Sequence, residues 1–285
     1  MLLLAHRFSV VSSRGVASAR YSAASDGRRE PPGGGRRPVG REARCRAAPR
    51  LPSGGGNDRH RALRAVPRTV RSMSNVIVFG GHGKVALLAT RLLTDRGHTV
   101  TSVIRNADQS DEVRAHGGEP RIADVQEQSL TDFADLVRGQ DAVLWSAGAG
   151  GGSVDRTWAI DRDAAVLSIQ GAARAGVDRY VMVSWSGSEL DHGIPQDDDF
   201  FAYAQSKMIA DAVLRDSDLQ WTVVAPSTLT DDEPTGSVDW DGSSSQVPRG
   251  DVAHVVADVL EDPYTAGRTI RFNGGSTPVA DFLRG

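Results

Sequence analysis

Cysteine and lysine are nearly missing from this chain. Its 285 residues include a single cysteine, Cys45, so neither a disulfide nor a cysteine-based metal site can form within one chain. Lys84 and Lys207 are the two lysines, and the other 31 basic residues are arginines. This preference for arginine is typical of GC-rich coding sequence. The two positions that keep lysine against this bias are therefore candidates for a specific role.

Long apolar runs and an even distribution of charge are also missing. No run approaches the roughly 20 apolar residues that span a bilayer, so we expect no membrane partner. Residues 1–72 contain 16 arginines and four acidic residues; subtracting these from the totals of 33 and 36 leaves 17 basic and 32 acidic residues, a net charge of −15, in 73–285. Because a polyanion would be repelled by such a body, we predict that the folded part binds no nucleic acid.

Residues 1–72 have no apolar periodicity and are dominated by glycine, proline and arginine. Such a segment cannot bury enough apolar surface to offset its ordering entropy, so we predict a disordered tail. It could be a transit peptide, a basic tail for polyanions, or sequence upstream of a true start at Met73. We favour the start at Met73, because a strand pattern begins two residues later, and hence a cytoplasmic location. An organellar location follows if the tail is a genuine transit peptide.

From residue 75 onward, short β-branched runs alternate with segments of helical periodicity. This alternation predicts βαβ units and a parallel sheet, hence one α/β domain over 73–285 of the Rossmann type, doubly wound, with small substrate-side elements near its C-terminus. The helix expected over 156–176 would place Asp161 and Asp163 on a solvated face. The expected strands are 75–81, 99–105, 119–125, 141–150, 179–185, 219–227 and 267–274.

A glycine turn follows the first expected strand and opens the first helix. Its pattern is Gly80-x-x-Gly83-x-x-Ala86. Glycines permit a tight turn and a close approach of backbone to a pyrophosphate, and the N–H groups of the helix N-terminus attract the anion. The context of strand, turn and helix predicts a dinucleotide site, with Lys84 and Val85 as further cofactor contacts.

The ends of the next strands indicate which dinucleotide binds. An acidic residue at the end of the second strand typically holds the ribose 2′-hydroxyl of NAD, but Arg105 occupies that place here. A guanidinium suits a 2′-phosphate, so we expect NADP(H) to be favoured over NAD(H). Asp124 could accept from the adenine amino group. The small residues Ala147 and Gly148 would let the cofactor lie across the sheet edge.

The second retained lysine lies four residues after a tyrosine. Tyr203 and Lys207 share one face of an expected helix. We predict that the ammonium lowers the phenol pKa and makes Tyr203 an acid/base group. Alternation along the preceding strand places Ser184, Ser186 and Ser188 on one side, where a hydroxyl could hold a substrate oxygen.

Together these motifs resemble the short-chain dehydrogenase/reductase superfamily. The spacing of the glycine turn and the late segment 249–262 resemble its atypical NAD(P)H-binding branch, near the NmrA-like and epimerase/dehydratase members. The resemblance covers 75–282 and implies that Tyr203 is the acid/base, that Lys207 bonds the nicotinamide ribose, and that Ser186 orients the substrate, with Ser184 as the fallback. The chain departs from the pattern at Ala86 and in the short segment 227–246, which disfavours a sugar-nucleotide substrate.

The sequence thus predicts an NADP(H)-dependent oxidoreductase that acts on a small carbonyl or hydroxyl compound. A non-catalytic NADP(H) sensor and a redox-neutral epimerase or isomerase remain alternatives. His192 lies among acidic residues, but its surroundings lack metal-ligand spacing, and we predict a polar lid over 189–201 and no metal. Nothing in the sequence indicates an oligomeric state.

Overall fold

The computed structural model describes residues 74–242 and 244–285. The predicted disorder of residues 1–72 and the expected start at Met73 concern residues outside this part of the chain.

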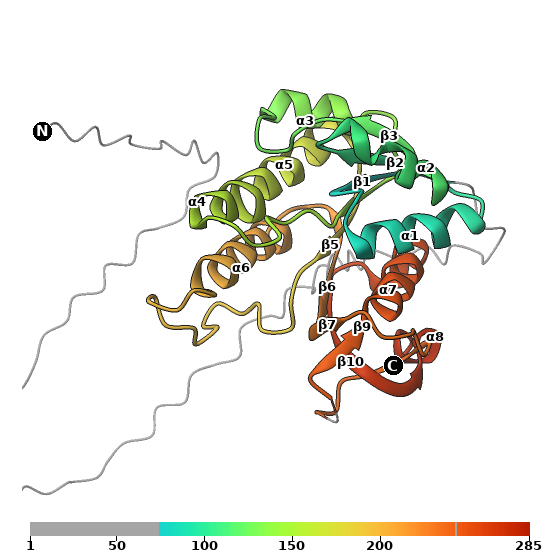
Figure 1. Ribbon diagram of the computed structural model, residues 1–285, viewed down its shortest axis with the longest axis vertical. Helices are drawn as coiled ribbons and strands as arrows, with labels where there is room; N and C mark the ends of the chain where they lie inside the picture. The colour runs from blue at the N-terminus through green and yellow to red at the C-terminus, as the bar shows by residue number, and fades with distance from the viewer. Residues whose placement is uncertain (1–73, 243) are drawn as a thin grey trace, which may run out of the picture. The chain divides into compact units, whose positions relative to one another are not determined.

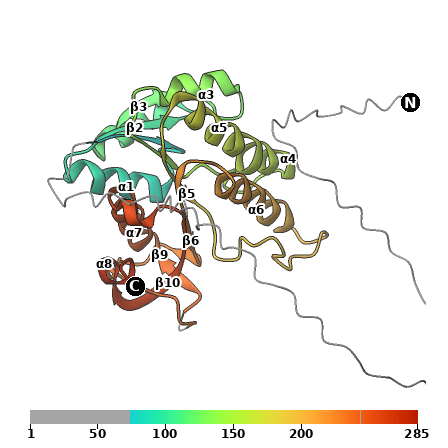
Figure 2. The ribbon, with the colours of Figure 1, turned by 180° about the vertical axis from the view of Figure 1, so that it is seen from behind.

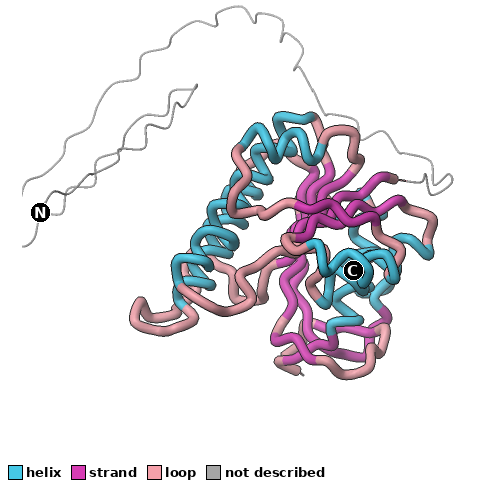
Figure 3. Tube along the Cα trace, turned by 45° about the horizontal axis from the view of Figure 1, so that its top comes forward, coloured by secondary structure: helices cyan, strands magenta, loops and turns pink. Residues whose placement is uncertain are grey.

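An eight-stranded sheet lies at the centre, in the order β3-β2-β1-β4-β5-β6-β10-β8 (Figures 1 and 3). Neighbouring strands are parallel except β10 and β8, which are antiparallel. The predicted α/β fold with a Rossmann-type parallel sheet is confirmed. Because β1 pairs with both β2 and β4, the strand order reverses there, which is where ligands bind in such sheets. The strands are β1 (Asn75–Phe79), β2 (Thr99–Ile104), β3 (Glu119–Ile122), β4 (Ala142–Trp145), β5 (Arg179–Val183), β6 (Gln220–Pro226), β8 (Ser237–Asp239) and β10 (Arg268–Pro278).

Helices cover both faces of this sheet (Figures 1 and 2). On β1, Val76 and Val78 join the core beneath α1 (Lys84–Asp95) and α7 (Arg249–Glu261). The alternate residues Ile77 and Phe79 join the core on the other face. Burial on both faces explains why this strand reads as one continuous apolar run. The helices of the second face are α3 (Leu130–Val137), α5 (Ala165–Ala175) and α6 (Phe201–Arg215).

An aromatic cluster fixes the two strands whose ends form the candidate site. The ring of Phe79 on β1 lies 5.5 Å from that of Phe133 and 5.4 Å from that of Trp145, which belongs to β4. All three side chains are fully buried. A Cβ at Gly171 of α5 would lie 2.7 Å from that of Phe133, so glycine lets α5 pack closely over the cluster. Truncation of Phe133 to alanine should cost about 3–5 kcal/mol.

The segment predicted as one helix over 156–176 is divided into three parts. It consists of α4 (Val154–Thr157), the π-helical segment η2 (Trp158–Ala164) and α5, which ends at Gly176 with φ 75°. A π-helical segment interrupts the regular angular spacing of side chains. Helical periodicity alone therefore does not tell which residues of this segment are buried.

The remaining elements are short. A parallel pair of strands follows β6 and forms a separate two-stranded sheet of β7 (Thr228–Thr230) and β9 (Gln246–Pro248). Within 74–242 and 244–285, no helix combines the length and the apolar character that crossing a membrane requires. The other short helices are η1 (Ala107–Gln109), α2 (Ser110–Ala115), η3 (Pro263–Thr265) and α8 (Val279–Phe282).

Candidate functional site

The turn from β1 into α1 depends on glycine. Gly80 has a φ of +76°, and a Cβ added there would lie 2.5 Å from the Cα of Ala147. Only glycine therefore lets this turn pack against the chain that leaves β4. Gly83 donates its N–H to the Gly80 carbonyl over 2.8 Å and is the N-cap of α1. Because Gly83 has no side chain to cap the helix, the first N–H groups of α1 suit an external anion.

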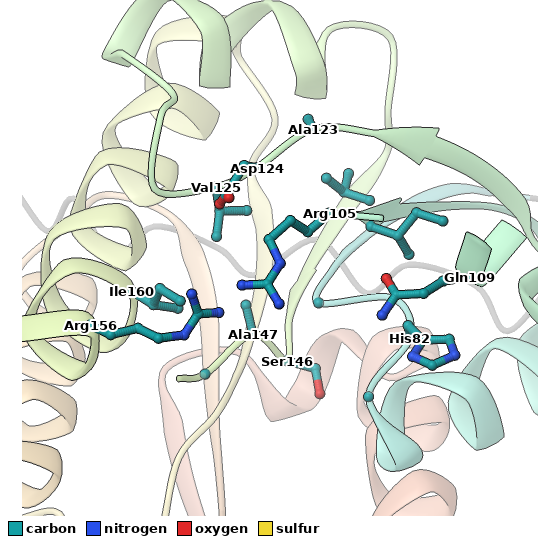
Figure 4. Close-up of a pocket in the computed structure, with 15 residues that line it drawn as sticks. His82, Arg105, Gln109, Ala123, Asp124, Val125, Ser146, Ala147, Arg156 and Ile160 are labelled. Carbon is teal, nitrogen blue, oxygen red and sulfur yellow. The ribbon is translucent and has the colours of Figure 1, made fainter. Parts of the chain in front are cut away.

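A cavity of about 210 Å³ opens beside this turn, at the carboxyl ends of β1, β2, β3 and β4 (Figure 4). Most of the residues predicted to bind a cofactor contribute to it: Gly80, Gly83, Arg105, Asp124, Ala147 and Gly148. The structure thus brings together residues spread over nearly 70 positions of sequence. The cavity is also lined by His82, Gln109, Val125, Ser146, Arg156 and Ile160.

Two guanidinium groups face each other across the cavity (Figure 4). Arg105 follows β2, and within the described residues it has no hydrogen bond or ion pair. Arg156 comes from α4 and donates from Nη1 to Oε1 of Gln126 over 2.6 Å. The N–H of Gln126 in turn bonds the carboxylate of Asp124 over 3.1 Å. The cavity therefore carries two positive charges, which suit a phosphate.

Two of the predicted cofactor contacts lie elsewhere. The Lys84 ammonium is exposed and lies 2.7 Å from Oδ2 of Asp231, whose other oxygen accepts from Arg249 over 2.7 Å. Val85 is buried in the core between α1 and the sheet. Neither side chain lines the cavity, because Lys84 is directed to Asp231 and Val85 to the core.

One face of α6 carries Tyr203, Lys207 and Asp211 at successive helical turns. Lys207 is 3% exposed, and its Nζ lies 3.9 Å from Oδ1 of Asp161. The other oxygen of Asp161 accepts from the Ala149 N–H over 2.9 Å. Since Ile160 lines the cavity and Asp161 follows it, the η2 segment links the cavity to Lys207.

The expectation that Asp161 lies on a solvated face is wrong. Its side chain is 1% exposed, and burial raises the pKa of its carboxyl group, although Lys207 opposes this shift. The cause of the error is the π-helical η2 segment, which turns Asp161 toward α6. Its neighbour Asp163 is exposed and pairs with Arg162, as a surface residue does.

The predicted lowering of the Tyr203 pKa is also wrong. Burial raises the pKa of the Tyr203 phenol, and the carboxylates of Asp161 and Asp211 raise it further. The sequence pattern suggested one ammonium beside the phenol, but the structure surrounds that ammonium with two buried carboxylates. A phenol is protonated at neutral pH even at its ordinary pKa of about 10, and the upward shift keeps Tyr203 protonated to higher pH.

The three serines after β5 have different surroundings. The hydroxyl groups of Ser184 and Ser188 each donate to Oδ2 of Asp211 over 2.6 Å. Ser186 lies between them and is partly exposed, and its hydroxyl has no partner in the described part of the chain. Its backbone N–H donates to the Pro226 carbonyl over 2.9 Å. Ser186 is thus the serine of the three whose hydroxyl can bond an external molecule.

Aromatic rings lie beside Tyr203. The Phe200 ring is 5.1 Å from that of Tyr203 and 5.1 Å from that of Trp185. His192, weighed above as a metal ligand, has its Nε2 3.1 Å from Oε1 of Gln205 and its Nδ1 accepting from a backbone N–H. The segment 185–200, which precedes α6, therefore contributes aromatic contacts near Tyr203 and a hydrogen-bonded histidine.

Comparison with known proteins identifies the family. A family model described as NAD(P)H-binding matches residues 80–263, from the glycine turn to the end of α7. This chain belongs to that NAD(P)H-binding family. The resemblance to the atypical branch of the short-chain dehydrogenases/reductases is thereby confirmed. Among its relatives is a protein of Bacillus subtilis named "uncharacterized sugar epimerase YhfK", which is 30% identical over 213 residues, or 73% of this chain and 98% of that protein.

Solved structures support the same assignment to the NAD(P)H-binding family. A Bacillus halodurans protein described as a candidate NAD-dependent epimerase/dehydratase is 31% identical, with a TM-score of 0.69 over 74% of this chain and 99% of that one. A short-chain dehydrogenase/reductase from Veillonella parvula, solved in complex with NADP, is 18% identical, with a TM-score of 0.56 over 72% and 96% of the two chains. At that identity the second protein shares the fold.

The residues of this family member fit an NAD(P)H dinucleotide. A side chain at Gly80 would collide with Ala147, so the turn is kept open for backbone contact with a ligand. The uncapped start of α1 suits a diphosphate, and the guanidinium groups of Arg105 and Arg156 suit a further phosphate. Asp124 also lines the cavity, with a carboxylate that can accept a hydrogen bond.

Sequence reasoning missed three functional candidates in this NAD(P)H-binding chain. Asp161 and Asp211 are buried carboxylates around Lys207, and Arg156 is the second guanidinium of the cavity. The position of Asp211, eight residues after Tyr203 on the same helical face, was a signal that could have revealed it. Nothing in the sequence marked Arg156, because arginine is the usual basic residue of the chain.

Proposed function

We propose that this protein is an NADP(H)-dependent reductase of a small carbonyl compound. The observation that carries the proposal is the geometry of α6. Tyr203 and the buried Lys207 share its inner face, and Asp161 links Lys207 to the backbone at Ala149, directly after the residues that line the cavity. An acid/base pair is thus connected to the site for the dinucleotide.

The cavity supports NADP(H) as the cofactor. Arg105 has a fully charged guanidinium without a partner in the described residues, and a 2′-phosphate would supply two or three acceptor oxygens for it. The 2′-hydroxyl of NAD(H) would leave this charge without a counterion. We therefore expect NADPH to bind more tightly than NADH.

The side chains near Tyr203 support reduction rather than oxidation. The nicotinamide ring, when bound, supplies a hydride to the carbonyl carbon. The Tyr203 hydroxyl, which is protonated at neutral pH as an ordinary phenol is, donates its proton to the carbonyl oxygen, so that C=O becomes CH–OH. The Ser186 hydroxyl donates a hydrogen bond to the same oxygen, and the Lys207 ammonium stabilises the phenolate that remains.

Two measurements on the purified protein test this function. The first is titration with NADPH and NADH, and the second is an assay of NADPH oxidation with a panel of small aldehydes, ketones and quinones. The Tyr203→Phe variant should lose turnover by about 10²- to 10⁴-fold, because it lacks the proton donor, and should bind NADPH as the wild type does. Tyr264→Phe is the matched control, since Tyr264 is 76% exposed. Binding of NADPH without oxidation by any carbonyl would favour a cofactor sensor and contradict the reductase.

A redox-neutral epimerase is the second candidate, supported by the name of the Bacillus subtilis relative. Such an enzyme oxidises and re-reduces one substrate, so it consumes no cofactor overall. Cofactor retained through purification, together with substrate isomerisation and constant NADPH absorbance, would favour this candidate over the reductase.

A further inference from the structure

Asp211 is a fully buried carboxylate that takes no direct part in the proposed proton transfer. Its Oδ2 accepts two hydrogen bonds of 2.6 Å, from the hydroxyl groups of Ser184 and Ser188. Its Oδ1 is buried and has no hydrogen-bond partner among the described residues. Arg215 approaches Oδ2 to 3.8 Å from the next turn of α6. Two hydroxyl hydrogen bonds of this length to one carboxyl oxygen fix the two serines firmly.

The two serines are the ends of the turn that carries Ser186. Ser184 follows β5 and donates its N–H to the Val224 carbonyl over 2.8 Å. Ser188 donates its N–H to the Trp185 carbonyl over 3.1 Å, which closes the turn. Asp211 therefore ties both ends of the turn to α6, while Ser186 between them keeps a free hydroxyl.

The same helix carries the proton donor. Tyr203, Lys207 and Asp211 lie at i, i+4 and i+8, so they project from one face of α6. The Asp211 contacts consequently fix the turn of Ser186 relative to the helix of Tyr203. Burying a carboxylate is a costly way to hold a turn, and an apolar contact would stabilise the fold as well or better. What distinguishes Asp211 is that the turn it holds carries Ser186 and that its own helix carries Tyr203.

We infer that Asp211 is a positioning residue that holds the 184–188 turn against α6, so that the Ser186 hydroxyl and the Tyr203 phenol meet the same substrate oxygen. The inference rests on the proposed reductase function. It assigns no chemical step to Asp211 itself, whose carboxylate is occupied by the two serines.

A double-mutant cycle between Asp211→Asn and Ser186→Ala tests the inference. Asp211→Asn weakens the two serine bonds, and it should lower kcat about 10- to 100-fold while KM and the Kd of NADPH change less than about threefold. In the Ser186→Ala background the same substitution should change kcat by less than about threefold, because the group it positions is gone. Equal losses in both backgrounds would overturn the inference and leave the reductase function standing.

Asp251→Asn is a matched control. Asp251 is also fully buried on a helix, and it also holds a turn, through the N–H groups of Thr235 and Gly236 at 3.0 and 2.7 Å. It lies on α7, on the other face of the sheet from α6. This variant should lose stability and keep the kcat of the wild type. A similar loss of kcat in Asp251→Asn would mean that general loosening of the fold explains both results, against the inference.

A readout independent of turnover uses Trp185, which lies inside the turn. In protein labelled with fluorotryptophan, Trp185→Phe identifies its resonance among those of the five tryptophans. Asp211→Asn, and separately the single change Ser188→Ala, should shift or broaden this resonance. An unchanged resonance in both variants would refute the positioning role. If the wild type reduces no carbonyl, the reductase proposal fails, and the resonance alone then decides whether Asp211 holds the turn.

Discussion

The two ends of the candidate site are built in different ways. Around the glycine turn, the ligand surface is mostly backbone and small side chains, and its shape depends on Gly80 and on the close approach of Ala147. Around Tyr203, the surface depends on buried charges, with Lys207 between Asp161 and Asp211. The first end depends on a fixed backbone shape. The second depends on an electrostatic balance, by which we mean the attraction between the Lys207 ammonium and the carboxylates of Asp161 and Asp211. Substitutions should therefore affect stability and binding at the first end, and stability and proton transfer at the second.

The largest effect is expected at Lys207. Replacing it with methionine leaves two buried carboxylates without their ammonium, and the free energy of unfolding should fall by about 3–5 kcal/mol. Denaturant unfolding of the variant measures this loss. Adding Asp161→Asn to Lys207→Met should recover part of the stability, because the uncompensated charge is removed. A double variant as unstable as the sum of the single ones would contradict the electrostatic balance.

Gly80→Ala tests the fixed shape of the other end. The new Cβ would overlap Ala147 at a positive φ, so we expect NADPH affinity to fall about 100-fold, or roughly 2.7 kcal/mol, and stability to fall as well. Calorimetric titration measures the affinity. Gly97→Ala is the control, because Gly97 has a φ of +91° with no atom within 4 Å of a Cβ. It should lose about 1–2 kcal/mol of stability and keep its affinity.

Arg105→Gln should change the choice of cofactor. Loss of the guanidinium should weaken NADPH binding by about 10- to 100-fold, as expected for a charge-assisted contact with phosphate, and leave NADH binding nearly unchanged. Arg156→Gln should have a smaller effect in the same direction, since that side chain is already bonded to Gln126. Arg138→Gln, on an exposed side chain at the end of α3, is the control. Equal losses for NADPH and NADH would contradict recognition of a 2′-phosphate.

The smallest effect concerns pH. Reduction needs a protonated Tyr203, and burial together with two carboxylates raises the pKa of this phenol above its ordinary value of about 10. The kcat for carbonyl reduction should therefore stay constant as pH rises through about 10, the ordinary pKa of a phenol, and fall only at higher pH. Asp161→Asn removes one of the charges that raise the pKa, so its falling limb should lie at lower pH. A limb that does not move, or a kcat that rises with pH, would argue against Tyr203 as the acid.

The fold and the glycine turn could be predicted because backbone requirements leave a direct mark in sequence. Buried parallel strands read as apolar runs, and a tight turn against Ala147 demands glycine at position 80. Arg105 and Asp124 were found by their places at strand ends. These features depend on neighbours along the chain, which a sequence displays.

The charges around Tyr203 could not be predicted in the same way. The burial of Asp161 depends on the η2 segment, whose side-chain spacing differs from that of an α-helix, and the role of Asp211 depends on two serines more than 20 positions away. A Tyr-x-x-x-Lys spacing reports that an ammonium and a phenol share a helix face. It reports neither the burial of the phenol nor the carboxylates of Asp161 and Asp211 nearby, and burial first, then these carboxylates, raise the phenol's pKa.

The π-helical segment has a consequence for how this site could have arisen and could be altered. Each residue of an α-helix is rotated by about 100° from the one before it. Deleting one residue from 158–164 so as to restore regular α-helical winding would carry Asp161 around the helix axis and away from Lys207. The helical turns on both sides could stay in place. Deletion or insertion of a single residue, without any exchange of residue type, would thus be enough to remove or supply the carboxylate that faces Lys207.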